Sequence, residues 1–272
     1  MKTKYLLALL ALAGSAISTQ ATTVSVGLND LVLGFRATGG TGATTNLEIN
    51  LGNVSNFYGV SGQVTLTGLN VADLSSTFGA SWNTRSDLLW GVIGTTGNAA
   101  GTTAGGNAIA ASTLWASKSE STLTLQSTPW TQANVSAQQG PANTISTLYN
   151  GATASLNGAT ATGNSATAAL LSNSVNGSWS RQEGTVAFGF FTRSQFENNT
   201  NFGSSSIVAS DLYQVQPTGG PAVYVGTFAL NNNGTLVFGN SPNAVPEPSS
   251  YAAIFGAVVL GFVALRRRRA KN

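Results

Sequence analysis

The chain has 272 residues, with 12 Lys or Arg and 9 Asp or Glu, and it contains neither cysteine nor histidine. The lack of these two residue types excludes a thiol nucleophile, a Ser-His-Asp triad and almost every kind of zinc site. Seven of the 12 basic residues lie within the first four or the last seven positions, so residues 22–244 carry 5 basic and 8 acidic side chains and a net charge of −3. The composition therefore predicts no nucleic-acid partner, which would need a basic patch on the folded body.

Residues 1–21 have the layout of a secretory signal peptide. Two lysines precede a short apolar run, Tyr5–Ala13, and small or polar residues follow it. This order predicts a signal helix, export through the Sec translocon, and cleavage after Ala21, with Ala16 as a second candidate cleavage position. The alternative is an uncleaved membrane helix, which is disfavoured because the apolar run is too short to cross a bilayer.

Residues 22–240 are rich in Gly, Ser, Thr and Asn, with Val, Leu and aromatic residues in short runs between them. This pattern predicts a mainly all-β body, an antiparallel β-sandwich or jelly roll with one or two short helices. An exported body without cysteine is held together by core packing alone, and about 220 residues can bury enough apolar surface for this.

In the first half of this body, the pattern predicts several strands, a helical turn over Ala72–Phe78 and a long exposed loop over residues 97–112. The run Leu47–Leu51 alternates apolar and polar residues, so we expect its leucines and isoleucine on one buried face. The run Leu88–Gly94 has no polar side chain, so we expect a strand that is buried on both faces. The strands predicted in this half are Val24–Leu28, Asp30–Arg36, Leu47–Leu51, Val64–Leu66, Leu88–Gly94, Thr113–Ala116 and Thr122–Gln126.

In the second half, residues 131–150 have weak helical spacing, and Pro141 favours a helix that begins at Ala142. We expect another short helix over Ala166–Ser172 and a loop over the low-complexity residues 152–164. The strands predicted in this half are Thr185–Thr192, Leu212–Val215, and the hairpin Ala222–Leu230 with Thr235–Gly239, whose turn residues tolerate positive φ.

Asp30 and Glu48 form a candidate carboxylate pair for glycosidase chemistry, provided that they face each other across a hairpin. The favoured alternative is that each is a solvated strand or turn residue. Gly39–Gly42 lacks the Lys of a phosphate loop and no helical pattern follows it, so we expect a turn. No Asp-x-Asp spacing indicates a calcium site. The sequence therefore predicts no catalytic residue, no metal and no cofactor, and a body that is not an enzyme.

Five tryptophans occur in the body, and two of them are candidates for exposure. Trp130 and Trp179 lie among polar residues, and exposed indoles at these positions would stack on the sugar rings of an exopolysaccharide. The favoured alternative is that the tryptophans fill the core, as we expect for Trp90 between its apolar neighbours.

The linker over residues 241–248 ends in an extended tetrapeptide. Two prolines fix its backbone and prevent a helix from running back through it, so a helix can begin only after the second proline. The four residues of this motif are Val245, Pro246, Glu247 and Pro248.

Residues 249–265 follow as an apolar run without charge. These 17 residues would span about 25 Å as a helix, which is close to the hydrocarbon thickness of a bilayer, so we expect a transmembrane helix. Residues 266–272 should remain cytoplasmic under the positive-inside rule, because the run ends in a basic cluster. The cluster consists of Arg266, Arg267, Arg268 and Arg269.

This order of segments resembles the PEP-CTERM sorting signal, which occurs on exported proteins of Gram-negative bacteria that make exopolysaccharide. The resemblance covers Val245–Lys271, about a tenth of the chain, and Pro246-Glu247-Pro248 is its signature. It implies recognition by an exosortase, a membrane-embedded protease that cuts near the motif. It also implies a precursor anchored in the inner membrane and a mature form at the cell surface or outside the cell. The alternative is an ordinary C-terminal anchor.

Together these features predict a non-enzymatic surface or extracellular-matrix protein, in the setting of an exopolysaccharide biofilm. The alternative is a polysaccharide-binding module or a polysaccharide-active enzyme of that matrix. A cleft with two carboxyl groups about 5 to 9.5 Å apart would favour the enzyme.

Overall fold

The computed structural model describes residues 21–98, 103–104, 106–120, 126–134, 136–145, 157–160, 167–175, 177–185 and 193–239. The predicted signal helix, the sorting motif, the transmembrane helix and the basic tail therefore lie outside the described residues, and Ala21 is the first residue inside them. Within those ranges, no helix is both long enough and apolar enough to cross a membrane.

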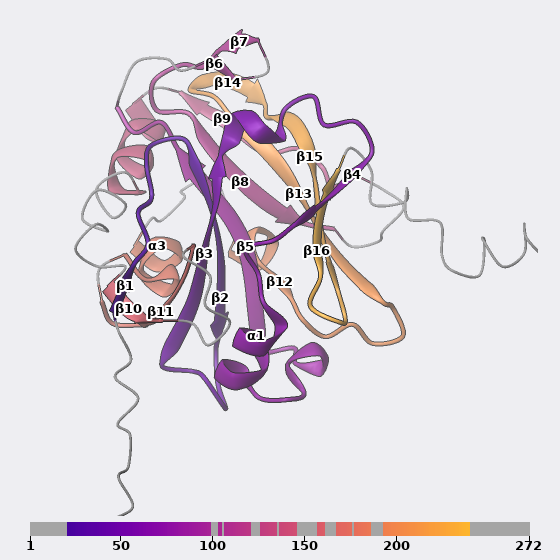
Figure 1. Cartoon of the computed structure of the whole chain (residues 1–272). Coiled ribbons are helices and arrows are strands. Elements are labelled where there is room, and N and C mark those ends of the chain that lie inside the picture. The colour runs from indigo at the N-terminus through magenta and orange to yellow at the C-terminus, as the bar shows by residue number, and fades with distance from the viewer. Residues whose placement is uncertain are drawn as a thin grey trace, which may run out of the picture.

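Twelve strands form one antiparallel sheet that curls around its core (Figure 1). The mainly antiparallel β fold is confirmed, but the strands continue from edge to edge in a single sheet, in place of the two packed sheets of a sandwich. In spatial order the strands are β1 (Ala21–Thr23), β10 (Asn157–Thr160), β11 (Ala168–Ser172), β3 (Thr45–Asn53), β2 (Asp30–Ala37), β5 (Leu88–Thr95), β8 (Leu114–Ser119), β13 (Ile207–Val215), β15 (Val223–Asn231), β16 (Leu236–Gly239) and β4 (Gln63–Leu66), with β12 (Asn198–Asn199) paired to β5 off this path.

Two small sheets and several short helices complete the described fold. One small sheet pairs β14 (Thr218–Pro221) with β9 (Thr131–Asn134), and the other pairs β6 (Thr103–Ala104) with β7 (Asn107–Ala108). Residues 136–145 are helical. The remaining helices are η1 (Val54–Phe57), α1 (Val71–Phe78), η2 (Trp82–Thr84), α3 (Trp179–Thr185) and α4 (Arg193–Phe196).

The inner face of the sheet carries the larger apolar cluster. Phe35 of β2 and Trp90 of β5 are neighbours in the register and are fully buried there, as predicted for Trp90. The curl of the sheet brings Phe228 and Phe238 of β15 and β16 into the same cluster, where both rings contact Phe57 of η1. The inner face is therefore closed by aromatic packing between strands that are distant in sequence.

The outer face is covered by helices instead of by strands. Val32, Ile93 and Ala116 point to this side, and α3, α4 and the helix over residues 136–145 pack on it. Because both faces are covered, most central strands are apolar on both sides. The prediction that Leu88–Gly94 is buried on both faces is confirmed, with six of its seven residues buried and only Leu89 partly exposed.

Several predicted elements are confirmed by the described residues. Helix α1 occupies the expected segment and is capped by Asn70, whose side chain accepts a hydrogen bond from Ala72 N at 2.8 Å. The β15–β16 hairpin has its turn at Asn231–Gly234, where Gly234 has a φ of 87°. Leu47 and Ile49 lie on one buried face of β3, as their alternation predicts.

Five predicted elements are wrong, and two of them are the predicted loops over residues 97–112 and 152–164, which contain the strands β6, β7 and β10. Ala168–Ser172 is strand β11 and not part of a helix, because it pairs with the apolar strand β3, and this pairing overrides a weak local preference. The helix predicted from Ala142 already begins at residue 136, where Asn134 Oδ1 accepts a hydrogen bond from Ala137 N at 2.9 Å. Val24–Leu28 is not a strand. Most of Thr122–Gln126 and Thr185–Thr192 lies outside the described residues.

Candidate functional site

An open pocket of about 420 Å³ lies at the end of the sheet that carries α1. Its wall combines the turn between β2 and β3 with the end of α1 and the segment that leads into β5. Its lining residues are Gly40, Thr41, Phe78, Gly79, Ala80, Ser81, Arg85 and Asp87.

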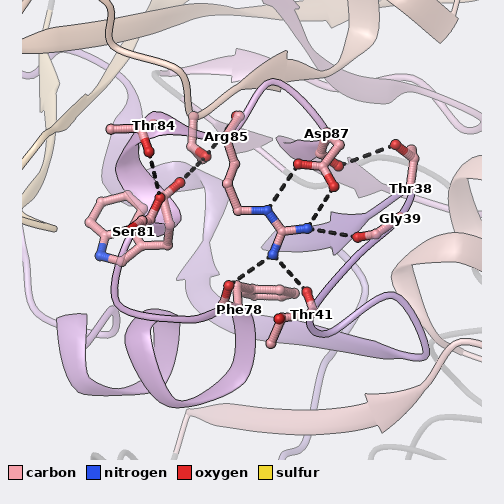
Figure 2. Close-up of polar contacts among 10 residues, drawn as sticks. Thr38, Gly39, Thr41, Phe78, Ser81, Thr84, Arg85 and Asp87 are labelled. Atoms are coloured by element: carbon pink, nitrogen blue, oxygen red, sulfur yellow. Dashed lines mark hydrogen bonds and ion pairs between the residues drawn. The ribbon is translucent and has the colours of Figure 1, made fainter.

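Arg85 is the centre of this pocket's hydrogen bonding (Figure 2). Its guanidinium donates to both carboxylate oxygens of Asp87, at 2.9 and 2.6 Å, and to the carbonyls of Gly39, Thr41 and Phe78, at 2.7, 2.7 and 2.8 Å. These contacts use all five of its N–H donors. The arginine therefore ties three segments of the body together and has no donor left for a bound anion.

The charge of the pocket is balanced within it. The hydrogen bonds from Arg85 hold the pKa of Asp87 below its usual range, so this carboxyl group is ionised at neutral pH. Asp87 is the only carboxyl group in the described pocket lining. General acid–base hydrolysis of a glycoside needs two carboxyl groups, so the described lining lacks that arrangement.

The two candidate sugar-stacking residues are buried, so the favoured interpretation of core tryptophans holds and the candidate exposure is wrong. Trp130 is 3% exposed and Trp179 is 0% exposed. Their polar sequence neighbours do not decide their exposure, because each indole packs on residues that are far away in sequence. The ammonium group of Lys118 lies 4.4 Å from the centre of the Trp130 ring.

Trp179 is seated in a recess that two glycines open in the sheet. Gly34 and Gly91 are paired across β2 and β5, and a Cβ atom added to Gly34 would lie 1.9 Å from the indole. Phe196 of α4 stacks on the indole with the ring centres 5.6 Å apart. The Trp179 Nε1–H group donates to Glu197 at 2.7 Å. Apolar packing and a charge-assisted hydrogen bond therefore dock α3 on the outer face.

Glu197 also joins this site to β2. Arg36 Nε donates to its two carboxylate oxygens at 2.8 and 3.1 Å, and Arg36 Nη2 donates to Oε2 at 2.5 Å. The Arg36 and Glu197 side chains are only 13% and 2% exposed. This is a bidentate ion pair with little exposure to solvent. The free-energy cost of removing its two charges from water is offset only while the hydrogen bonds keep their geometry.

Glu48 of β3 caps α3 from the sheet. Its carboxyl group accepts hydrogen bonds from Trp179 N and from Gln182 Nε2, and neighbouring Asn46 accepts one from Ser180 N at 2.8 Å. Burial raises the pKa of Glu48 to about 8, although these hydrogen bonds oppose the rise. Glu48 is therefore mainly protonated at neutral pH.

Asp30 and Glu48 are not brought together as a carboxylate pair. Asp30 is opposite Asn53 in the β2–β3 register, whereas Glu48 is opposite Gly34, four positions along β2, or about 13 Å. Asp30 is partly exposed and accepts hydrogen bonds from Gly27 N and Asn50 Nδ2. The expectation of solvated residues holds for Asp30, but Glu48 is only 2% exposed.

Asp211 and Glu120 form a cluster of carboxyl groups that the sequence did not predict. Asp211 of β13 is fully buried and accepts hydrogen bonds from Ser127 N, Ser127 Oγ and Thr227 Oγ1 at 2.6 to 2.7 Å. Burial and the neighbouring Asp211 carboxyl group raise the pKa of Glu120 to about 9, so Glu120 is protonated at neutral pH. Asp211 thereby fixes the segment around Ser127 to the outer face. No linear motif marks this cluster, because its members come from three separate segments.

Comparison with known proteins identifies one segment of the chain. No curated protein and no solved structure matches the sequence. Residues 244–269 match the model of the PEP-CTERM protein-sorting motif. This segment of the chain contains the Pro246-Glu247-Pro248 signature and the four arginines. The predicted resemblance is therefore confirmed, and the chain carries a PEP-CTERM protein-sorting motif at residues 244–269.

Proposed function

We propose that this chain is an exported, non-enzymatic surface or extracellular-matrix protein that an exosortase processes near Pro246-Glu247-Pro248. The observation that carries the proposal is the PEP-CTERM match over residues 244–269, since this motif indicates exosortase-dependent sorting of an exported protein. The secretory layout of residues 1–21 supplies the export step.

The chemistry of the motif supports processing at the membrane surface. Two prolines keep the tetrapeptide extended, and an extended backbone is the form that a protease cleft accepts. The apolar run that follows places the tetrapeptide beside the bilayer, and Arg266–Arg269 stop translocation and set its depth.

The described body supports a role without catalysis. Arg85 and Asp87 neutralise each other, and Glu48 and Glu197 cap and dock α3. All five tryptophans are at most 3% exposed, so the described structure offers no indole platform for a sugar ring. This burial removes the observation on which the polysaccharide-binding alternative was based.

A host with and without its exosortase tests the proposal. The full chain is expressed in both backgrounds, and separate antibodies follow the body and residues 249–272. We expect release of the body only where the exosortase is present. Glu247→Ala should leave the body in the membrane fraction, whereas Asn243→Ala, a matched change in the same linker, should be released normally. Equal release with and without the exosortase would contradict the proposal.

The non-enzymatic role has its own test. Purified body is incubated with exopolysaccharide from the same host, and newly formed reducing ends are measured. We expect none above the buffer control. Turnover that is lost in Asp87→Asn or Asp211→Asn would establish an enzyme instead.

A further inference from the structure

The last described strand is firmly fixed in the sheet. All four residues of β16 are buried, and the strand is hydrogen-bonded to β15 on one side and β4 on the other. Phe238 lies against Gly226, where an added Cβ would be 2.3 Å from the ring. At the strand end, Gly239 is opposite both Thr227 and Gln63. The folded body therefore holds the chain in place as far as Gly239.

The sorting motif begins a short distance further along the chain. Seven Cα–Cα steps separate Gly239 from Pro246, and a fully extended chain of that length spans at most about 25 Å. A membrane-embedded protease that holds Pro246 in its cleft is therefore within about 25 Å of Gly239, closer than the diameter of a small domain.

The direction of β16 selects the part of the body that faces the enzyme. The turn before β16 lies near α1, where Asn83 Nδ2 donates to Asn232 O at 2.9 Å. From there β16 runs toward the opposite end of the sheet, the end that carries β14 in Figure 1. Residues 58–63 and 223–226 continue from Gln63 and Thr227, the strand partners of Gly239, at this end, and we call them the exit rim. Val223 is its most exposed large apolar residue, at 49%.

The exit rim differs in charge from the opposite end of the sheet. Neither of its two segments contains an acidic or basic residue, whereas the end near α1 carries Arg85 and Asp87. An uncharged surface can approach another protein without desolvating a charge.

We propose that the exit rim is the surface of the body that contacts the extracytoplasmic face of the exosortase during processing, with residues 240–245 as a spacer of nearly minimal length. The inference rests on the proposed function. A charge placed on the rim is then desolvated when the enzyme engages the motif. A longer spacer relieves that contact, and a shorter one draws the rim into the enzyme.

Paired variants in the exosortase-containing host test this contact. Val223→Glu places a charge on the exit rim, and Val175→Glu is the matched control, since Val175 is 39% exposed in a loop whose Asn173 bonds to Thr44 near the other end of the sheet. We expect Val223→Glu to lower the processed fraction at least threefold and Val175→Glu to leave it unchanged, with equal melting temperatures. Inserting Gly-Ser-Gly-Ser after Asn240 should restore processing of Val223→Glu.

Shortening the spacer gives a second test that leaves every described residue unchanged. Deletion of residues 241–243 should lower processing at least threefold. Normal processing of the deletion or of Val223→Glu, or a Val223→Glu defect that the insertion does not repair, would overturn the inference. If the unaltered chain itself escapes the exosortase, the proposed function fails, so the two failures are distinguishable.

Discussion

The folded body and the sorting segment use their ionisable residues in opposite ways. In the body, Glu48, Glu197 and Asp211 are buried, and each holds a helix or loop against the outer face of the sheet. In residues 244–269, four arginines follow one another directly after an uncharged run. The carboxyl groups of the body act through contacts between distant segments, whereas the arginines of the sorting segment act through their linear order. Variants of these buried carboxyl groups should therefore change stability, and variants of the sorting segment should change processing.

The largest loss of stability is expected from Glu197→Ala. This change removes the acceptor of three hydrogen bonds from Arg36 and one from Trp179, in a site that is almost fully buried. Breaking one partner of a buried ion pair costs about 3–5 kcal/mol. Denaturant unfolding of the purified exported protein measures this loss.

Glu197→Gln is the matched control, because it keeps an acceptor for Trp179 and should lose less stability than Glu197→Ala. An Ala variant within about 0.5 kcal/mol of the parent would show that Glu197 does not dock α3.

Gly34→Ala should cost about 1–3 kcal/mol, because its new Cβ overlaps the Trp179 indole and the indole is held by Phe196 and Glu197. Denaturant midpoints of the two proteins provide the measurement. Gly140→Ala is the control: no atom outside its chain neighbours and its own helix backbone lies within 4 Å of its added Cβ, and it belongs to the helix over residues 136–145. It should change the midpoint little, because the gain in helix propensity is opposed by Pro141, whose ring crowds the Cβ of the residue before it. Equal midpoints for Gly34→Ala and the parent would contradict the glycine recess.

This recess shows what could not be predicted from the sequence. Trp179 is surrounded in sequence by polar residues, yet its partners Gly34, Gly91 and Glu197 come from three other segments of the chain. Local polarity contains no information about such pairings. The alternation of apolar and polar residues in Leu47–Leu51, by contrast, was sufficient to predict the buried face of this strand. Both the alternation and the strand geometry depend on neighbouring residues alone.

The same distinction applies to the candidate sites. The sorting motif was predictable, since its chemistry depends on residues that are adjacent in sequence. The Arg85 contacts were not, because their carbonyl acceptors on Gly39 and Thr41 lie more than 40 positions away. The Asp30–Glu48 pairing failed because sharing a hairpin does not place two residues opposite each other.

A further effect on the stability of the body is expected from pH. Glu48 has a pKa of about 8 in the folded body and about 4.5 when unfolded, so the folded state retains a proton that the unfolded state loses. The free energy of unfolding should therefore fall as pH rises from about 4.5 to about 8, by at most about 1.4 kcal/mol per pH unit for this group, and then level off. Glu120 extends the fall toward pH 9, with a smaller contribution because it is partly exposed.

Denaturant unfolding between pH 5 and pH 9 measures this dependence. Glu48→Gln, which cannot ionise, should flatten the curve in that range. A stability that rises with pH from 5 to 8 in the parent protein would refute the assignment of a protonated, buried Glu48.

Variants of the sorting segment should change processing and leave the stability of the body unchanged. Replacing Arg266–Arg269 with Ser should weaken membrane retention and orientation of the precursor, because the positive charges that stop translocation are lost. The melting temperature of the body should stay unchanged. A change in melting temperature with normal processing would break the separation between the two regions.

The central claim is tested most directly by the intact mass of the exported form, purified from a host that contains the exosortase. We predict a mass that corresponds to a chain without residues 249–272, with its new C-terminus close to Pro246-Glu247-Pro248. A mature protein that still ends in Lys271-Asn272 would contradict exosortase processing and leave residues 249–272 as an ordinary C-terminal anchor.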